Sequence, residues 1–65
     1  MVLIPKTDIF DLTFPKRKTF TKGEAYEVED TSNYNGMIQY ITMDNQNVRN
    51  YISVSGTFIN NFLVG

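Results

Sequence analysis

The stretch Gly56-Thr57-Phe58-Ile59-Asn60-Asn61-Phe62-Leu63-Val64, read with Phe20-Thr21-Lys22-Gly23-Glu24 upstream, carries the most information about the fold. In the upstream segment, Gly23 supplies a backbone that is free to adopt a positive φ in a turn just before an alternating strand. In the C-terminal segment, a coil of one turn separates two aromatic residues, Phe58 and Phe62. We expect both rings to be buried and to close the open end of a small β-barrel.

Regular alternation of apolar and acidic side chains predicts a strand over residues 24–30. Tyr26 and Val28 fall on its inward face, and the intervening glutamates face water. The polar segment Thr31-Ser32-Asn33-Tyr34-Asn35-Gly36 follows and ends in Asn-Gly, a strong turn dipeptide. We therefore expect a loop here.

Two further strands follow this loop. Residues 37–43 carry large side chains on both faces, which predicts a central strand. A short hairpin connection at 44–47 leads to the returning strand at 48–54. Ser55-Gly56 breaks that strand, and the segment 58–62 is expected to form a single 3₁₀ turn.

The N-terminal third of the chain is less regular. Val2-Leu3-Ile4 is expected to be a short edge strand that ends at Pro5. Residues 9–12 alternate and are expected to pair with the C-terminal segment, and residues 13–18 form a loop around a proline. Short strands with no helix to cover them predict an all-β barrel of about five strands, as a single domain over residues 1–65.

The amino-acid composition limits the kinds of catalysis and metal binding that the chain can support. The 65 residues include five Phe and four Tyr, so hydrophobic burial alone can hold the fold, but they include no Cys and no His. The usual general base, thiolate nucleophile and commonest metal ligand are therefore absent. We expect no enzymatic activity, no bound metal and no cofactor. The apolar residues 1–4 are too few for a signal peptide or a membrane span, so we expect a cytoplasmic protein.

Charge is distributed unevenly along the chain, although the net charge is only −1. Residues 1–22 hold five basic and two acidic side chains, for +3, whereas residues 23–65 hold one basic and five acidic side chains, for −4. This asymmetry fits self-association, a partner docked on one face, or neutralisation across neighbouring strands.

The run Lys16-Arg17-Lys18 concentrates the positive charge. It is either a solvated loop tip or a binding site for an anion, such as the carboxylates of a protein or a phosphate backbone. If the run binds nucleic acid, the neighbouring Phe14 and Phe20 offer surfaces on which bases could stack. The sequence pI of about 5.0 opposes binding to a phosphate backbone. Tyr34 and Tyr51 are expected to be partly exposed, either as interface anchors or as ordinary covering of the barrel.

Three of these segments resemble parts of an SH3 domain, in the same order. Residues 9–12 are similar to the family's Leu-Tyr-Asp-Tyr strand, and residues 20–24 resemble its Phe-Lys-Lys-Gly-Glu turn. Residues 56–63 resemble the closing Gly-x-Phe-Pro-x-Asn-Tyr-Val. The resemblance covers about residues 9–64, and it implies an SH3-like barrel.

The resemblance also implies a peptide-binding groove, which in the family receives a polyproline segment. Its positions correspond here to Phe10, Leu12, Ile59, Asn61 and Phe62. The family's groove tryptophan is missing, its proline is replaced by isoleucine, and its acidic loop is basic. These differences argue against proline-rich ligands and favour an acidic partner.

The sequence therefore predicts a small non-enzymatic protein-binding module. We expect it to dock on a larger protein and modulate it, and its size and composition fit a bacterial or phage source. The binding surface is expected to include Phe10, Lys16, Arg17, Lys18, Tyr34, Tyr51, Ile59 and Phe62. The alternatives are a nucleic-acid-binding barrel that uses the Lys16–Lys18 loop, and a structural homo-oligomer built by strand pairing along exposed edges.

Overall fold

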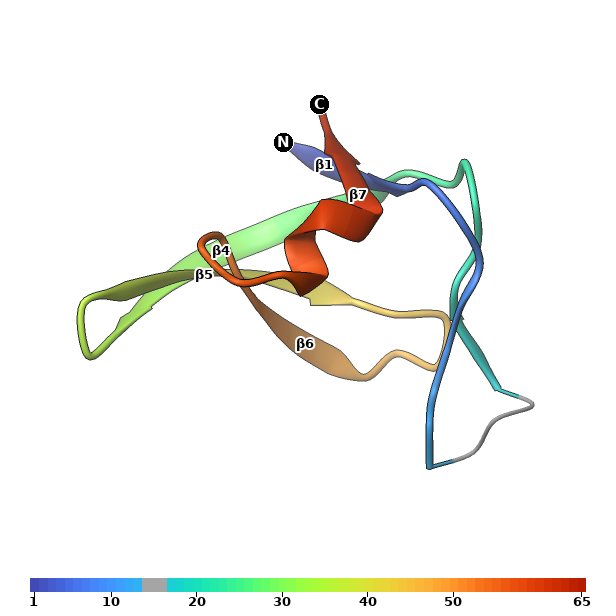
Figure 1. Ribbon diagram of the computed structural model, residues 1–65, viewed down its shortest axis with the longest axis horizontal. Helices are drawn as coiled ribbons and strands as arrows, with labels where there is room; N and C mark the ends of the chain where they lie inside the picture. The colour runs from blue at the N-terminus through green and yellow to red at the C-terminus, as the bar shows by residue number, and fades with distance from the viewer. Residues whose placement is uncertain (14–16) are drawn as a thin grey trace.

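The computed structural model describes residues 1–13 and 17–65, and nearly all of its regular structure is β (Figure 1). The strands are β1 (Val2–Pro5), β2 (Ile9–Phe10), β3 (Lys18–Phe20), β4 (Tyr26–Tyr34), β5 (Met37–Met43), β6 (Arg49–Ser53) and β7 (Phe62–Val64). One 3₁₀ turn, η1 (Phe58–Asn61), precedes the last strand. The predictions of an all-β chain and of a 3₁₀ turn near its C-terminus are confirmed.

Five strands form one antiparallel sheet in the order β6-β5-β4-β1-β7. β2 and β3 form a separate two-stranded ribbon. The large sheet curls, so that η1, which leads into β7 at one edge, contacts β6 at the other edge (Figure 1). The curling gives a small barrel-like fold, as the absence of covering helices predicted.

The hairpin of β4 and β5 is longer than the sequence indicated. β4 continues through Tyr34, which pairs with Met37, so the expected loop at 31–36 is wrong for its first four residues. The polar side chains of these residues gave no strand pattern in the sequence, but their main-chain groups form hydrogen bonds with β5. The turn itself is at Asn35 and Gly36, whose φ angles of 52° and 80° are those of a type I′ hairpin.

The N-terminal strand lies inside the sheet rather than at its edge. β1 pairs with β4 on one side and with β7 on the other, so two expectations are wrong: β1 is no edge strand, and residues 9–12 do not pair with the C-terminal segment. Pro5 is tolerated because β1 pairs with β4 only at Val2 and Leu3, so no ladder bond requires its missing N–H. The Pro5 carbonyl instead accepts the N–H of Gly23 at 3.0 Å.

Gly23 has the positive φ that its place in the turn predicted, at 80°. The N–H of Glu24 donates to the carbonyl of Thr21 across the same turn, at 3.1 Å. This conformation is strained for residues with a Cβ, so the turn depends on glycine.

The core is small and joins four segments of the chain. Leu3, Phe20, Ile52 and Phe62 are buried in one cluster. The partly buried side chains packed against this cluster are Ile9, Tyr26, Val28, Tyr40 and Ile59. The inward orientation predicted for Tyr26 and Val28 is confirmed, as is the burial of Phe62.

The expected burial of Phe58 is wrong, because its side chain remains 40% exposed. Its ring contacts that of Phe62 edge to face, with centroids 5.5 Å apart, but does not enter the core. A 3₁₀ turn has 3.0 residues per turn, so residues three apart share a face. Ile59 and Phe62 therefore point into the core together, and Phe58 lies on a different face of the turn.

Candidate functional site

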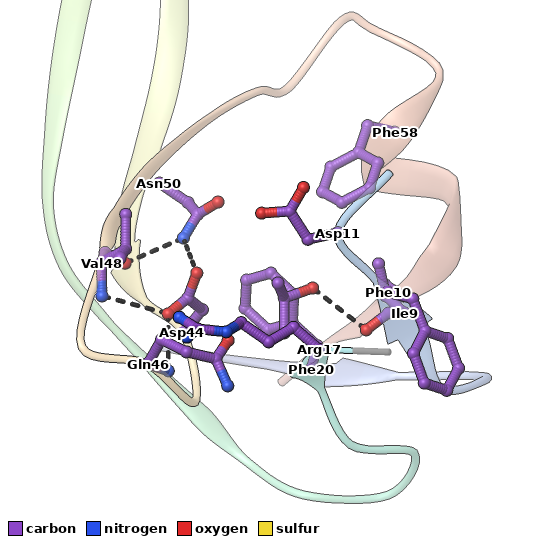
Figure 2. A pocket seen from close by; sticks show the side chains of 11 residues that line it. Ile9, Phe10, Asp11, Arg17, Phe20, Asp44, Gln46, Val48, Asn50 and Phe58 are labelled. Carbon is purple, nitrogen blue, oxygen red and sulfur yellow. Dashed lines mark hydrogen bonds between the residues drawn. The ribbon is translucent and has the colours of Figure 1, made fainter. Parts of the chain in front are cut away.

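A groove of about 430 Å³ opens between the β2–β3 ribbon and β6, and we name it the hairpin groove (Figure 2). Its lining comes from four parts of the fold: the ribbon, the turn after β5, β6, and the first residue of η1. The lining residues are Ile9, Phe10, Asp11, Arg17, Thr19, Phe20, Asp44, Gln46, Val48, Asn50 and Phe58.

Part of the lining of the hairpin groove is apolar and accessible. Phe10 is 45% exposed and Phe58 is 40% exposed, and they come from β2 and η1 respectively. Val48 is 55% exposed and lies across the groove from them, just before β6 (Figure 2). Exposed aromatic side chains around a cavity can take up an apolar side chain of a partner.

The turn after β5 places a carboxylate in the groove. Asp44 Oδ1 accepts the main-chain N–H groups of Gln46 at 2.8 Å and Val48 at 3.0 Å. Its Oδ2 accepts from the Asn50 side-chain amide at 3.0 Å. This is an Asx-type turn, in which an aspartate satisfies the main chain two residues ahead. The turn is completed by Asn47 in the left-handed region, at φ 59°.

The ribbon supplies a second carboxylate and a guanidinium. Asp11 Oδ1 accepts the N–H of Thr13 at 2.8 Å, and the main-chain N–H of Asp11 donates to the carbonyl of Arg17 at 3.0 Å. The side chain of Arg17 also lines the groove. The described lining residues thus carry two carboxylates and one guanidinium, for a formal charge of −1.

Gln46 adds a further acceptor. Its Nε2 donates to the carbonyl of Lys18 at 3.2 Å. Its Oε1 is buried and has no hydrogen-bond partner in the described part of the chain. A buried acceptor without a donor carries a free-energy cost, which a donor entering the groove would relieve.

Two of the residues predicted to bind a partner meet at the hairpin groove. Phe10 and Arg17 both line it. Lys18 lies in β3 instead, and its ammonium forms an ion pair with Asp8 at 3.5 Å, so part of the basic run is paired within the fold. Lys16 lies outside the described residues.

The other predicted site residues lie elsewhere. Ile59 is half-buried against the core, and Phe62 belongs to the core itself. Tyr34 and Tyr51 are 66% and 54% exposed, in agreement with the expected partial exposure. Neither lines the groove.

Sequence reasoning missed Asp44, Asn50 and Phe58. The segment 44–47 was interpreted only as a turn, although an aspartate that opens a turn also presents a carboxylate. Phe58 was assigned to the core, although the 3₁₀ period separates its face from that of Phe62. Nothing in the sequence indicated that this turn faces the β2–β3 ribbon.

Asp8 links the start of the ribbon to the turn before β4. The N–H of Lys22 donates to Asp8 Oδ1 at 2.9 Å. This main-chain bond lowers the pKa of the Asp8 carboxyl below its ordinary value; the positive charges of Lys18 and Lys22 act in the same direction, and desolvation partly opposes them. The ionised form of Asp8 therefore stabilises the fold.

We expect this stabilisation to depend on pH with a defined sign. Because the pKa of Asp8 is lower in the folded protein, its contribution is present above the unfolded pKa, near about 4, and is lost as the pH falls through the folded value. Asp8→Asn should be less stable than the wild type to urea at neutral pH, and this difference should shrink as the pH falls below the unfolded pKa. Glu24→Gln is the control. A difference that does not change with pH would contradict the assignment.

The described residues contain no group of three or more Asp or Glu side chains placed to hold a metal ion. In the same residues, no helix is long and apolar enough to cross a membrane. A comparison of the chain with protein-family models, with curated proteins and with solved structures finds no significant match.

Proposed function

We propose that the protein is a small non-enzymatic protein-binding module, which docks on a larger protein and modulates it. The observation that carries this proposal is the hairpin groove with exposed aromatic side chains on its walls, Phe10 and Phe58. Aromatic residues that stay accessible in so small a fold are typical anchors of protein interfaces.

The chemistry of the groove favours binding over catalysis. The chain has no Cys or His to act as a nucleophile or as the usual general base. The Asp44 carboxylate is committed to hydrogen bonds that hold its own turn. Accessible aromatic side chains beside polar groups that are fixed by hydrogen bonds are common in recognition sites.

We further propose that the fold is an SH3-like barrel. Support comes from the strand order β6-β5-β4-β1-β7, the ribbon between the first and fourth strands, and the 3₁₀ turn before the last strand. The absence of cysteine fits a reducing compartment, so we place the protein in the cytoplasm of a bacterial cell, including one infected by a phage.

The groove proposal is tested by comparing proteins captured from a lysate of the source organism by three forms of the chain. The wild type is compared with the double variant Phe10→Glu, Phe58→Glu, and with Tyr34→Glu as the control. Tyr34 is an exposed aromatic residue outside the groove. We expect quantitative mass spectrometry to show a partner that the wild type and the control retain and the double variant loses.

Two outcomes would contradict this proposal. One is equal capture of the same partners by the double variant, with its fold verified by circular dichroism. The other is capture of nucleic acid instead of protein, lost steeply as salt is raised, which would favour the alternative of a nucleic-acid-binding barrel.

A further inference from the structure

In the five-stranded sheet of the described residues, three stretches of strand lack a neighbouring strand on one side. They are β6, β7 and the far half of β4. Unpaired strand edges present main-chain donors and acceptors to a further strand, and proteins normally protect them. The three edges differ in how well they are protected.

The edges of β4 and β7 are poor sites for a further strand. On β4, the pairing register shifts between Val28 and Asp30, and Asp30 Oδ1 accepts the N–H of Thr31 at 2.8 Å. The bulge and this hydrogen bond protect that edge. β7 has only three residues, which offers a short ladder.

The outer edge of β6 has no paired strand. Two hydrogen bonds fix the phase of this strand against β5: the N–H of Val54 donates to the Ile38 carbonyl, and the N–H of Asp44 donates to the Val48 carbonyl, both at 3.0 Å. In an antiparallel ladder, alternate residues turn their main-chain groups toward the same neighbour. The main-chain groups of Arg49 and Tyr51 therefore point away from β5, toward the free edge.

We propose that a second copy of this chain pairs with β6, antiparallel and with the two-fold axis at Asn50, so that the sheets of two copies become continuous. This register places Arg49 of one copy opposite Tyr51 of the other. Both residues have outward-pointing main-chain groups, so the two symmetric pairs form about four main-chain hydrogen bonds. The inference goes beyond the proposed function. Val48 and Asn50 also line the hairpin groove, so a second copy paired with β6 would compete with a partner that binds there.

Side chains on the outer face of β6 fit the same register. Arg49 is the only charged residue of the strand, and Tyr51 is 54% exposed. The two-fold axis sets each guanidinium opposite a tyrosine of the other copy, a favourable cation–π pair, rather than opposite a second arginine.

Side chains on the inner face also gain from this pairing. Val48 is 55% exposed although it directly precedes β6, the strand that carries the buried Ile52. In the proposed register it faces Ile52 of the second copy and loses contact with water. In the antiparallel register each Arg49 meets a Tyr51 and each Val48 meets an Ile52, so the edge is complementary to itself, and this feature favours a second copy over a foreign strand.

Sedimentation equilibrium of the full chain over a wide range of concentration tests the inference. We expect a monomer–dimer equilibrium for the wild type. Tyr51→Pro removes the N–H that points to the free edge and leaves the β5 ladder intact, so it should weaken dimerisation by at least about tenfold. Tyr51→Phe keeps the N–H and the ring and should dimerise like the wild type. A wild type that stays monomeric would overturn the inference.

Disulfide trapping gives a second readout that does not depend on proline. The chain has no native cysteine, so a single one reports on its own position. Asn50→Cys places two thiols across the two-fold axis, where opposite Cβ atoms lie about 5 Å apart, and should be oxidised rapidly to a covalent dimer. Thr31→Cys, on the protected β4 edge, should not. Trapping at Thr31→Cys in preference to Asn50→Cys, or a dimer unaffected by Tyr51→Pro, would also overturn the inference.

Discussion

Replacing Phe20 by alanine is expected to lower the free energy of unfolding by about 3–5 kcal/mol. Phe20 is 1% exposed, and its ring meets Tyr26 and Phe62 edge to face, with centroids 4.9 and 5.3 Å away. The substitution therefore leaves a cavity where three elements meet. A domain of this size has a free energy of unfolding near the lower end of about 5–15 kcal/mol, so much of the variant should be unfolded.

Urea denaturation followed by circular dichroism measures this loss, and Phe58→Ala is the matched control. Phe58 touches the same aromatic cluster from outside and is 40% exposed, so its replacement should cost only about 1 kcal/mol. Equal losses for the two variants would contradict the placement of Phe20 in the core and Phe58 at the groove.

Replacing Asp44 by alanine is expected to cost about 3 kcal/mol of stability. The carboxylate is 8% exposed and accepts three hydrogen bonds, two of them from the main chain of its own turn. Alanine leaves those donors without a partner in a nearly closed site. The same turn donates the N–H of Asn45 to the Thr19 carbonyl at 2.8 Å, so its loosening should also disturb the β2–β3 ribbon.

Asp44→Asn separates the contribution of the hydrogen bonds within the turn from that of the negative charge. Its Oδ1 can keep the two main-chain hydrogen bonds and gives up only the bond to Asn50. We expect chemical denaturation to show a loss for asparagine of less than half that for alanine. Identical losses would mean that the negative charge, rather than the hydrogen bonding of the turn, stabilises this site.

The sequence predicted best those strands whose side chains alternate. Tyr26 and Val28 turn inward as their spacing indicated, because the period of two is a local property of a strand. Residues 31–34 were missed, because polar side chains on both faces give no alternation. β1 was misplaced for a different reason: its partners are distant in the sequence, and no local pattern reports which strand becomes its neighbour.

The candidate site was predictable only in part, for a related reason. Phe10 was predicted from the segment that resembles an SH3 domain and Arg17 from the basic run, and both signals are local in the sequence. Asp44 and Asn50 lie at the groove because the turn after β5 bonds to the ribbon through Asn45 and Gln46. That contact joins segments far apart in the chain, and turn chemistry alone does not reveal it.

The pairing of β1 with β7 sets the order in which this protein can fold. The N–H of Val2 donates to the carbonyl of Gly65, and the N–H of Gly65 donates back to Val2, each at 2.9 Å (Figure 1). A contact between such distant residues requires the largest loop closure in the chain, and such closures slow folding. During synthesis the β4–β5 hairpin can form early, whereas β1 can pair with β7 only after residues 62–65 have left the ribosome. Until then one edge of β1 is exposed, and this incomplete sheet is the species most prone to associate wrongly.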